Sequence, residues 1–401
     1  MLRKLALSLA VPLLLAAASP DPQKAGMDPA KLARIPARMR EFVDQGRIAG
    51  AVTLVARHGS IAALDAVGMQ DVEAKKPMRT DTIFQIMSMT KPVTATGIMM
   101  LAEEGKLSLL DPVEKFLPEF RGLWVIDSRD GDKARTLKRP SRRITIRDLL
   151  THTSGMAGMP PEGARDLLEK LDLTLAQAVA LYSQQPLEFE PGTRWLYSNP
   201  GIATLGRIIE VVSQQPYEKF LADRIFKPLE MKDTFFFPPE EKISRIAMLY
   251  NLENGTLKRA GADALAGDPA KYRKGAKYPC PECGLYSTAT DLAAFYQMML
   301  NGGTHNGRRL LSRASVEMAT TVQTGTLPTT YGLAWAIVGD PYSALSYRSI
   351  GTFGHGGAFG TEGWVDPKRD MIDILLIQRD GGGDATERTA LFSLAASSIA
   401  E

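Results

Sequence analysis

Apolar and polar residues alternate along both ends of the chain, which is the pattern of β-strands with a buried face. Near the amino terminus, residues 51–57 read Ala-Val-Thr-Leu-Val-Ala-Arg, and a His58-Gly59 turn separates them from an apolar run over 61–67. This arrangement predicts a β-hairpin. Strand patterns with short turns, as between antiparallel neighbours, return at 332–338, 350–354, 362–366 and 371–379.

The middle of the chain has a different texture, with helical spacing and loops rich in proline and glycine. Pro36 should kink the first predicted helix, because proline lacks the N–H that a helix interior requires. The predicted helices cover residues 28–44, 146–150, 175–184, 202–213, 217–225, 285–300 and 386–399.

Together the two patterns predict an α/β protein of the α+β type. A mixed, mainly antiparallel sheet is built from both chain ends and flanked by helices, and a mostly helical region is inserted between its halves. The expected sheet domain comprises 24–112 together with 276–401, and the expected helical domain comprises 113–275. An active site would lie at their interface.

Composition and charge narrow the function classes. Of the 401 residues, 44% are hydrophobic and 23% are charged, and the formal net charge is +3. These values are those of an ordinary globular protein with an ample core. Because no run of lysine and arginine marks a nucleic-acid surface, no nucleic-acid partner is predicted.

Residues 1–18 differ from the rest of the chain. Arg3 and Lys4 precede an apolar run over 5–15, and small residues then lead to Ser19. This order is typical of a secretory signal peptide. The apolar run is short for a membrane span, which favours cleavage over an uncleaved anchor. We therefore expect a periplasmic or secreted protein without stable membrane insertion after cleavage.

Cys280 and Cys283 are the only cysteines, in the sequence Cys-Pro-Glu-Cys. One pair cannot supply the four ligands of a structural zinc site, so no metal is predicted. An oxidising compartment favours a local disulfide. The pair is expected to lie in a loop without a catalytic partner, so that Cys→Ser changes should leave activity largely intact.

The stretch 84–102 carries the strongest chemical signal. From Pro92 onward it is apolar enough for a helix buried on nearly every side. Ser88 and Lys91 lie three residues apart near its start, and positions i and i+3 share a helix face. A buried ammonium is costly unless it is paired or loses its proton. Lys91 is therefore a candidate general base for a Ser88 nucleophile, although the same motif on an exposed helix would carry no function.

Tyr197 and Asn199 lie in a loop rich in proline and glycine, where positions i and i+2 can point the same way. The Tyr197 phenol, beside the ammonium of Lys91, could lose its proton more readily and relay it. The Asn199 amide could bind a substrate carbonyl or Lys91. By itself this motif is weak, and an amphipathic loop tyrosine is the commoner explanation.

The sequence Gly354-His355-Gly356-Gly357-Ala358 ends a predicted strand. Glycines at such a place often mark a site where a ligand approaches the backbone. A tight hairpin is the alternative interpretation of this segment taken alone.

In this order and spacing, the Ser-x-x-Lys, Tyr-x-Asn and His-x-Gly motifs resemble those of the serine β-lactamase and penicillin-binding-protein group. The resemblance is to the class C β-lactamase branch and in particular to the family VIII carboxylesterases. It implies a β-lactamase/transpeptidase-like fold, in which His152 is better interpreted as a structural loop residue than as a base. Further similar stretches are Gly46-Arg-Ile-Ala-Gly-Ala-Val, Leu149-Leu-Thr-His152-Thr-Ser-Gly-Met, Gly284-Leu-Tyr-Ser-Thr-Ala-Thr-Asp-Leu and Tyr331-Gly-Leu-Ala-Trp.

The resemblance also implies roles for the candidate residues. Ser88 would be the nucleophile of an acyl-enzyme mechanism, Lys91 its activating base, and Tyr197 the shuttle that protonates the leaving group and later helps to activate water. The backbone N–H groups of Ser88 and Ala358 would form the oxyanion hole. No metal or organic cofactor is implied. The residues implied to contact the substrate are Asn199, His355, Gly356 and Gly357.

His355 bears on the choice between ester and lactam. In the lactamases that the chain resembles, the corresponding strand usually carries Lys-Thr-Gly, whose cation and hydroxyl face the substrate carboxylate. A histidine near its ordinary pKa of ~6.5 is mostly neutral at pH 7. Loss of such a charged hydrogen bond costs roughly 1.5–3 kcal/mol. The sequence therefore predicts hydrolysis of small, short-chain esters, with β-lactams hydrolysed weakly or not at all. A class C-like β-lactamase, a D-alanyl-D-alanine carboxypeptidase and a penicillin-binding or sensor homologue without turnover are the alternatives.

The expected export can be tested directly. Protein purified from its native secretory route should begin close to Ser19, because signal peptides are cleaved after small residues. Amino-terminal sequencing checks this, and a purified protein that still contains Arg3 and Lys4 would contradict it.

Overall fold

The computed structural model describes residues 20–131, 133–162, 170–262, 267–268, 275–340, 347–380 and 386–400. The signal peptide expected at 1–18 lies outside these residues. Within the described ranges, no helix has both the length and the hydropathy needed to cross a bilayer.

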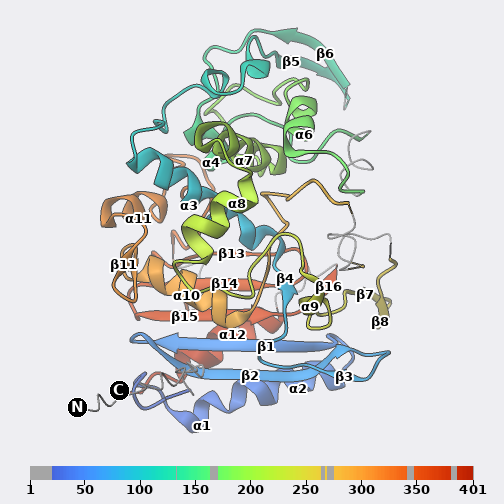
Figure 1. Ribbon diagram of the computed structural model, residues 1–401, viewed down its shortest axis with the longest axis vertical. Coiled ribbons are helices and arrows are strands. Elements are labelled where there is room, and N and C mark those ends of the chain that lie inside the picture. The colour runs from blue at the N-terminus through green and yellow to red at the C-terminus, as the bar shows by residue number, and fades with distance from the viewer. Residues whose placement is uncertain are drawn as a thin grey trace, which may run out of the picture.

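A seven-stranded sheet forms the base of the fold, and both chain ends contribute to it (Figure 1). Every adjacent pair in it is antiparallel. The amino-terminal strand β1 lies between β2 and the late strand β15, which confirms the fold class predicted from the sequence. In spatial order the strands are β12 (Ala336–Ile337), β13 (Phe353–Gly356), β14 (Glu362–Asp366), β15 (Met371–Leu376), β1 (Gly50–Arg57), β2 (Ser60–Asp71) and β3 (Lys76–Pro77).

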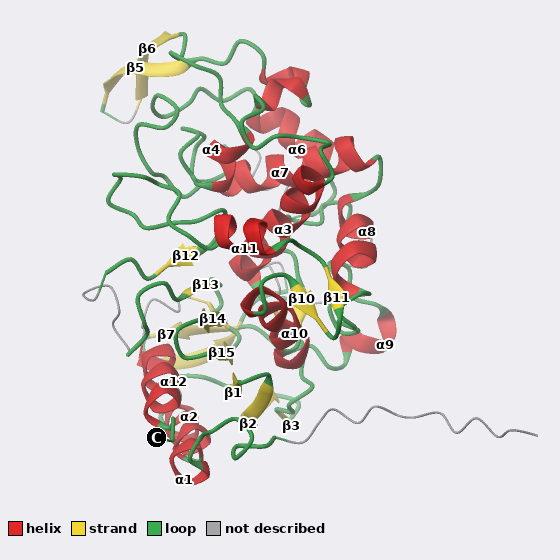
Figure 2. Cartoon of the chain, turned by 90° about the vertical axis from the view of Figure 1, so that its left-hand side faces the viewer, coloured by secondary structure: helices red, strands yellow, loops and turns green. Residues whose placement is uncertain are grey.

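Helices cover both faces of this sheet. Successive side chains of a strand point to opposite faces, so Val52 and Leu54 of β1 join the larger hydrophobic core while Ala51 and Val55 join a smaller one. The larger core contains the apolar side of α10, and the smaller core contains those of α2 and α12. Figure 2 shows α10 on one side of the sheet and α2 with α12 on the other. These helices are α10 (Ala289–Leu300), α2 (Arg34–Asp44) and α12 (Thr386–Ser397).

The larger core continues from the sheet into the helices of the middle of the chain. There α3 packs against α7 and α8, so a helix that is buried from Thr90 to Leu101 lies at the centre of the molecule. The remaining helices are α1 (Pro29–Leu32), η1 (Met87–Met89), α3 (Thr90–Glu103), η2 (Val113–Lys115), η3 (Pro118–Phe120), α4 (Ile146–Leu150), α6 (Leu175–Tyr182), α7 (Asn199–Ser213), α8 (Tyr217–Leu221), the π-helix η4 (Ala222–Phe226), α9 (Glu240–Ile243) and α11 (Arg313–Ala319).

Short strands outside the main sheet were not predicted, and four of them (β4, β9, β7 and β16) pair with residues that are distant in sequence. For example, β4 pairs with β9 and β16 pairs with β7. The hairpin of β5 and β6 has mostly exposed, charged side chains, which conceal a strand pattern. These strands are β4 (Phe84–Gln85), β9 (Tyr286–Ser287), β5 (Val125–Asp130), β6 (Lys133–Lys138), β7 (Tyr250–Glu253), β8 (Thr256–Arg259), β16 (Arg379–Asp380), β10 (Thr304–His305) and β11 (Arg308–Arg309).

Several predicted elements have different bounds in the structure; for example, the strand expected at 350–354 is β13 and the α-helix expected at 217–225 ends at Leu221. Three differences have a clear local cause. The first helix is not kinked at Pro36 but divided before it, and Pro36 lies in the first turn of α2, where a missing N–H is tolerated. The helix expected at 285–300 begins only after Thr288, whose side chain caps α10. The strand expected at 332–338 is reduced to β12, because Ala334 has a φ of 61° and the chain turns there.

Candidate active site

Ser88 lies in a tight turn directly before a buried helix. The turn is η1, and α3 follows it without a break. The residue before Ser88, Met87, has a φ of 49°, a left-handed conformation that costs energy for a residue with a side chain. Met87 and Met89 are buried whereas Ser88 is half-buried, so the turn presents the serine side chain to the surface.

Contacts from two distant segments hold this turn. Ile86 donates its N–H to the carbonyl of Leu285 at a distance of 2.9 Å, and its own carbonyl accepts from Thr361 Oγ1 at 3.0 Å. A strained conformation persists only where the surroundings over-determine it. These bonds to Ile86 provide that support next to Ser88.

Lys91 is buried in the first turn of α3 and bonds directly to Ser88. Its exposed fraction is 0%. Its Nζ donates to Ser88 Oγ at 2.9 Å and to the carbonyl oxygen of Glu282 at 2.9 Å. Burial lowers the pKa of Lys91 to about 7, against an opposite effect of the negative charge of Glu282. A lysine with this pKa is partly unprotonated at neutral pH and can accept a proton from the serine.

Tyr197 reaches the same two side chains from the loop before α7. The hydroxyl of Ser198 caps α7 by accepting the N–H of Gly201 at 3.0 Å, which fixes the direction of the chain at Tyr197. The Tyr197 ring centroid lies 4.7 Å from Lys91 Nζ, and its side chain hydrogen bonds to Ser88. The structure therefore brings Ser88, Lys91 and Tyr197 together.

The expectation that Tyr197 loses its proton more readily is wrong. Burial raises the pKa of the Tyr197 phenol above its ordinary value and outweighs the hydrogen bond with Ser88, which lowers it. The cation that would stabilise a phenolate, Lys91, is itself partly unprotonated near neutral pH. Tyr197 is therefore a neutral phenol, a proton donor rather than a base.

Asn199 does not bind Lys91. Its amide nitrogen donates to Met159 Sδ at 3.3 Å, while the Lys91 amine donates to Ser88 and to the carbonyl of Glu282. One of the two partners expected for the Asn199 amide is therefore excluded in this arrangement. Its contact with a substrate stays a prediction.

His152 contacts the loop that carries Tyr197. Its Nδ1 accepts the N–H of Ser198 at 3.1 Å, and its ring centroid lies 4.6 Å from that of Tyr197. Burial lowers the pKa of His152 well below its ordinary value, so the ring is neutral. These contacts suit the structural loop residue that the sequence indicates.

His355 lies on β13, and both of its ring nitrogens are bonded. Nδ1 is 2.7 Å from the carbonyl oxygen of Gly356, which can only accept, so Nδ1 carries the proton. Nε2 therefore accepts from the hydroxyl of Tyr331 at 3.1 Å. Burial, and secondarily the charge of Lys91, lowers the pKa of His355 to about 3. His355 is thus a neutral imidazole, with a pKa far below the ordinary value assumed from the sequence.

The strand end beyond His355 runs against the Ser88 turn. A Cβ at Gly357 would lie 2.4 Å from the carbonyl oxygen of Ile86 and 2.1 Å from Thr361 Oγ1, so only glycine permits this approach of two backbones. A Cβ at Gly356 would meet the carboxylate of Glu362 at 2.8 Å, which is the movable end of a side chain. Gly357 therefore has a packing role that Gly356 lacks.

Ala358 follows Gly357 and is exposed where the strand ends. Its N–H belongs to the backbone that Gly357 brings against the turn of Ser88. Two predictions stay untested. One is that Gly356 and Gly357 contact the substrate, and the other is that the Ala358 N–H binds an oxyanion.

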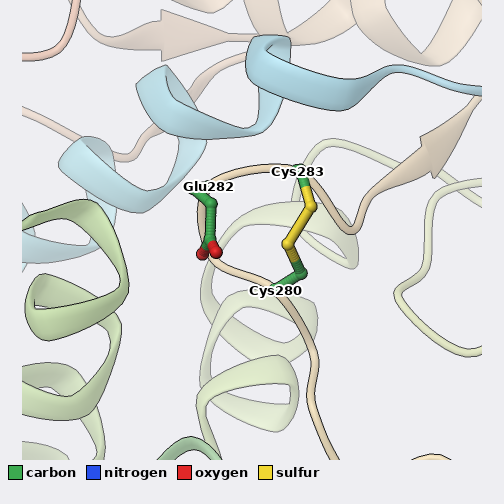
Figure 3. Close-up of side chains that lie close together, drawn as sticks. All are labelled: Cys280, Glu282 and Cys283. Atoms are coloured by element: carbon green, nitrogen blue, oxygen red, sulfur yellow. A yellow bond between two sulfur atoms is a disulfide. The ribbon is translucent and has the colours of Figure 1, made fainter. Parts of the chain in front are cut away.

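The Cys280–Cys283 loop lies against α3, and a disulfide closes it (Figure 3). Inside the loop, the Pro281 carbonyl accepts from Thr94 Oγ1 at 2.7 Å, and the Glu282 carbonyl accepts from Lys91. The expectation that the cysteine pair lies without a partner in the site is therefore wrong. The contact joins residues 191 positions apart, which local sequence patterns do not report.

The same loop gathers three potential metal-ligand atoms, from Cys280, Glu282 and Cys283, within 4.8 Å of one another. Both sulfurs are bonded to each other, so neither offers the thiolate that binds a metal ion.

Glu282 and Tyr331 are site residues that the sequence interpretation missed. Tyr331 opens one of the stretches that resemble the family, so a signal for it was present. Glu282 lies between the two cysteines, and nothing in its local sequence points to Lys91.

A serine hydroxyl hydrogen bonded to a buried lysine amine beside a half-buried tyrosine, on this fold, defines a serine hydrolase. The chain belongs to the β-lactamase family, because the family model described as Beta-lactamase matches residues 35–396. Esterase EstB of Burkholderia gladioli is 31% identical over 388 residues, which cover 90% of this chain and 94% of EstB. These findings confirm the resemblance stated from the motifs.

Solved structures show the same fold. One described as "EstCE1, a hydrolase with promiscuous acyltransferase activity" has a TM-score of 0.78 at 24% identity and covers 93% of this chain and 99% of its own. The octameric penicillin-binding protein homologue from Pyrococcus abyssi has a TM-score of 0.68 at 25% identity and covers 91% of this chain and 76% of its own.

The two glycines after His355 provide a matched pair of variants. Gly357→Ala should lower kcat for ester hydrolysis roughly 10²- to 10³-fold, the loss typical of one displaced oxyanion-hole donor, because the added Cβ forces two backbones apart. Gly356→Ala should stay within a few-fold of wild type, because the carboxylate that it meets can move. Steady-state kinetics with thermal melts of both variants checks this. Equal losses in the two folded variants would contradict it.

Proposed function

We propose that this protein is an exported carboxylesterase of the family VIII type, which hydrolyses short-chain esters through an acyl-enzyme on Ser88. The observation that carries the proposal is the 2.9 Å contact between Lys91 Nζ and Ser88 Oγ, made by a buried amine whose pKa is about 7. The similarity to an esterase supports the substrate class.

Acylation begins when Ser88 Oγ attacks the ester carbonyl carbon and its proton passes to Lys91 Nζ. The carbonyl oxygen becomes an oxyanion, which the N–H groups of Ser88 and Ala358 bind. As the bond to the alcohol breaks, Tyr197 donates its phenolic proton to the departing oxygen. The Lys91 ammonium returns a proton to Tyr197, so an alcohol leaves and both groups are restored.

Deacylation repeats these steps with water. As the water oxygen attacks the acyl carbon, water passes a proton to the Tyr197 oxygen while Tyr197 passes its own proton to Lys91 Nζ, so the phenol stays neutral and Lys91 is the base. The bond to Ser88 Oγ then breaks, and the proton returns to that oxygen. A carboxylic acid is released, and the serine hydroxyl is free for another cycle.

The preference for esters rests on His355. Its Nδ1–H is used by the Gly356 carbonyl and its Nε2 by the Tyr331 hydroxyl. A neutral ring with both nitrogens occupied offers no cation to the carboxylate of a β-lactam. A neutral ester needs none, so its binding loses nothing.

We also propose that the site lies between two domains. Ser88 and His355 come from the parts of the chain that build the sheet domain, 24–112 and 276–401, and Tyr197 comes from the helical domain, 113–275.

The nucleophile is tested by covalent labelling. Ser88→Ala should abolish both ester turnover and labelling by a fluorophosphonate, because the serine oxygen forms the bond to phosphorus, while thermal melting stays that of a folded protein. Intact-mass spectrometry and peptide mapping check the site. A label on another residue would refute the assignment.

Substrate choice is tested with two chromogenic compounds. Wild type should hydrolyse p-nitrophenyl butyrate faster than a chromogenic cephalosporin. His355→Lys should raise the ratio of kcat/KM for the cephalosporin over the ester roughly ten- to a hundredfold, the value of a charged hydrogen bond. His355→Gln, which adds no charge, should not. Faster turnover of the β-lactam by wild type would identify a β-lactamase instead.

A further inference from the structure

Glu282 is a carboxyl group buried next to the candidate base. The residue is 6% exposed. Tyr278 donates its hydroxyl to Oε1 at 2.9 Å, whereas Oε2 has no hydrogen-bond partner among the described residues. A buried carboxylate with so few hydrogen bonds lowers the stability of the folded protein, so its presence calls for an explanation. Neither the proposed chemistry nor the core packing supplies one.

The backbone of the Glu282 loop follows the start of α3 closely. Successive loop carbonyls accept hydrogen bonds from it: Pro281 from Thr94 and Glu282 from Lys91, while the N–H of Leu285 donates to Thr90 Oγ1 at 3.2 Å. A shift of this loop therefore moves the partner of the Lys91 amine. The loop therefore belongs to the candidate site, because it supplies one of the two hydrogen-bond partners of Lys91 Nζ.

Several constraints hold the loop in one conformation. The disulfide joins its ends (Figure 3), and Cys280 has a φ of 54°. The Gly284 N–H donates to the Cys280 carbonyl at 2.7 Å. A Cβ at Gly284 would lie 1.8 Å from the Pro279 carbonyl oxygen, so the chain could not close this tightly with a larger residue. The Glu282 side chain projects from this closed loop.

The other titratable groups around the pair are neutral near pH 7. Burial lowers the pKa of the two histidines and raises that of the tyrosines, in each case away from neutrality. For Glu282 burial raises the pKa above its ordinary value, and for Lys91 it lowers it. The groups that face Lys91 or Glu282 are Ser88, Tyr197, His152, His355, Tyr278, Tyr182 and Tyr217.

We propose that Glu282 is a positioning residue for the candidate base: the Cys280–Cys283 disulfide holds it beside Lys91, where its carboxylate keeps the amine basic enough to take the Ser88 proton. This inference rests on the proposed role of Lys91. Burial alone would make the amine a weak base, and the negative charge of Glu282 opposes that effect. Because the two groups interact, they titrate as one pair and share a proton near neutral pH.

The charge of Glu282 should affect the pH dependence of kcat/KM. The rate requires unprotonated Lys91, so kcat/KM rises with pH as the pair loses its proton. Removing the charge at residue 282 leaves burial unopposed, so Lys91 loses its proton at lower pH. The acid limb of the profile should move to lower pH by roughly one to three pH units, the usual effect of a close opposite charge. The plateau should fall, because a weaker base accepts the serine proton less well.

The test is the pH profile of kcat/KM for p-nitrophenyl butyrate with Glu282→Gln. This variant keeps the size, the backbone carbonyl and an acceptor for Tyr278, and removes only the charge. Asp373→Asn is the matched control: it also removes a buried carboxyl, one whose pKa burial raises to about 8, but its charged neighbours are Asp366, Arg348 and Arg369. The acid limb of this control should coincide with that of wild type.

Two further measurements keep the proposal testable if Glu282→Gln does not fold. Tyr278→Phe removes the hydrogen bond that favours the carboxylate, so it should move the acid limb in the same direction by less. Reduction of wild type with a phosphine, verified by titration of two thiols, should lower kcat/KM, and reoxidation should restore it. Unchanged kinetics after full reduction would overturn the role of the disulfide.

The kinetics of three variants distinguish a wrong role for Glu282 from a wrong role for Lys91. If Ser88→Ala and Lys91→Ala are inactive but Glu282→Gln keeps the acid limb of wild type, Glu282 is only structural and the inference is wrong. If Lys91→Ala keeps near-normal rates, the proposed base itself is wrong.

Discussion

A lysine amine fully buried in the core of the protein is the constraint on which the rest of the site depends. α3 is buried along almost its whole length and packs at the centre of the larger core, so the Lys91 side chain is withdrawn from solvent. An ammonium in such a place must find partners or give up its proton. The Ser88 hydroxyl, the Glu282 carbonyl and the face of the Tyr197 ring are those partners. The burial that makes the lysine costly also makes it a base.

Close contact between backbones keeps these partners in place. The turn at Met87 is strained, and the carbonyl of Ile86 lies so near Gly357 that no larger residue fits there. Two segments from the carboxyl-terminal half of the chain bond to Ile86 and hold the turn. Strain of this kind stays local because the surrounding sheet and loop are rigid. The serine is therefore presented at one angle, toward the end of β13.

Burial in a site of low polarity sets the protonation states of its titratable groups. His152 and His355 are neutral because burial opposes their charged forms, and Tyr197 keeps its proton for the same reason. Burial displaces the pKa values of Lys91 and Glu282 toward each other, and the charge of each group opposes that displacement in the other. One environment thus produces a neutral His355 on β13 and a Lys91 amine that is partly unprotonated near neutral pH. The first property favours uncharged esters, and the second suits acyl transfer.

Local patterns in the sequence determined much of the fold and the first part of the site. The hairpin of β1 and β2, the strand Glu362–Asp366 and the helix Ile146–Leu150 follow from periodicity and turn residues. The Ser88–Lys91 contact follows from helix geometry, because it joins neighbours in sequence. Only the tertiary structure decided that the Glu282 carbonyl bonds to Lys91, that Tyr331 occupies Nε2 of His355, and that Tyr197 stays protonated. These outcomes depend on desolvation and on hydrogen-bond partners from distant parts of the chain, and periodicity reports only the backbone near each residue.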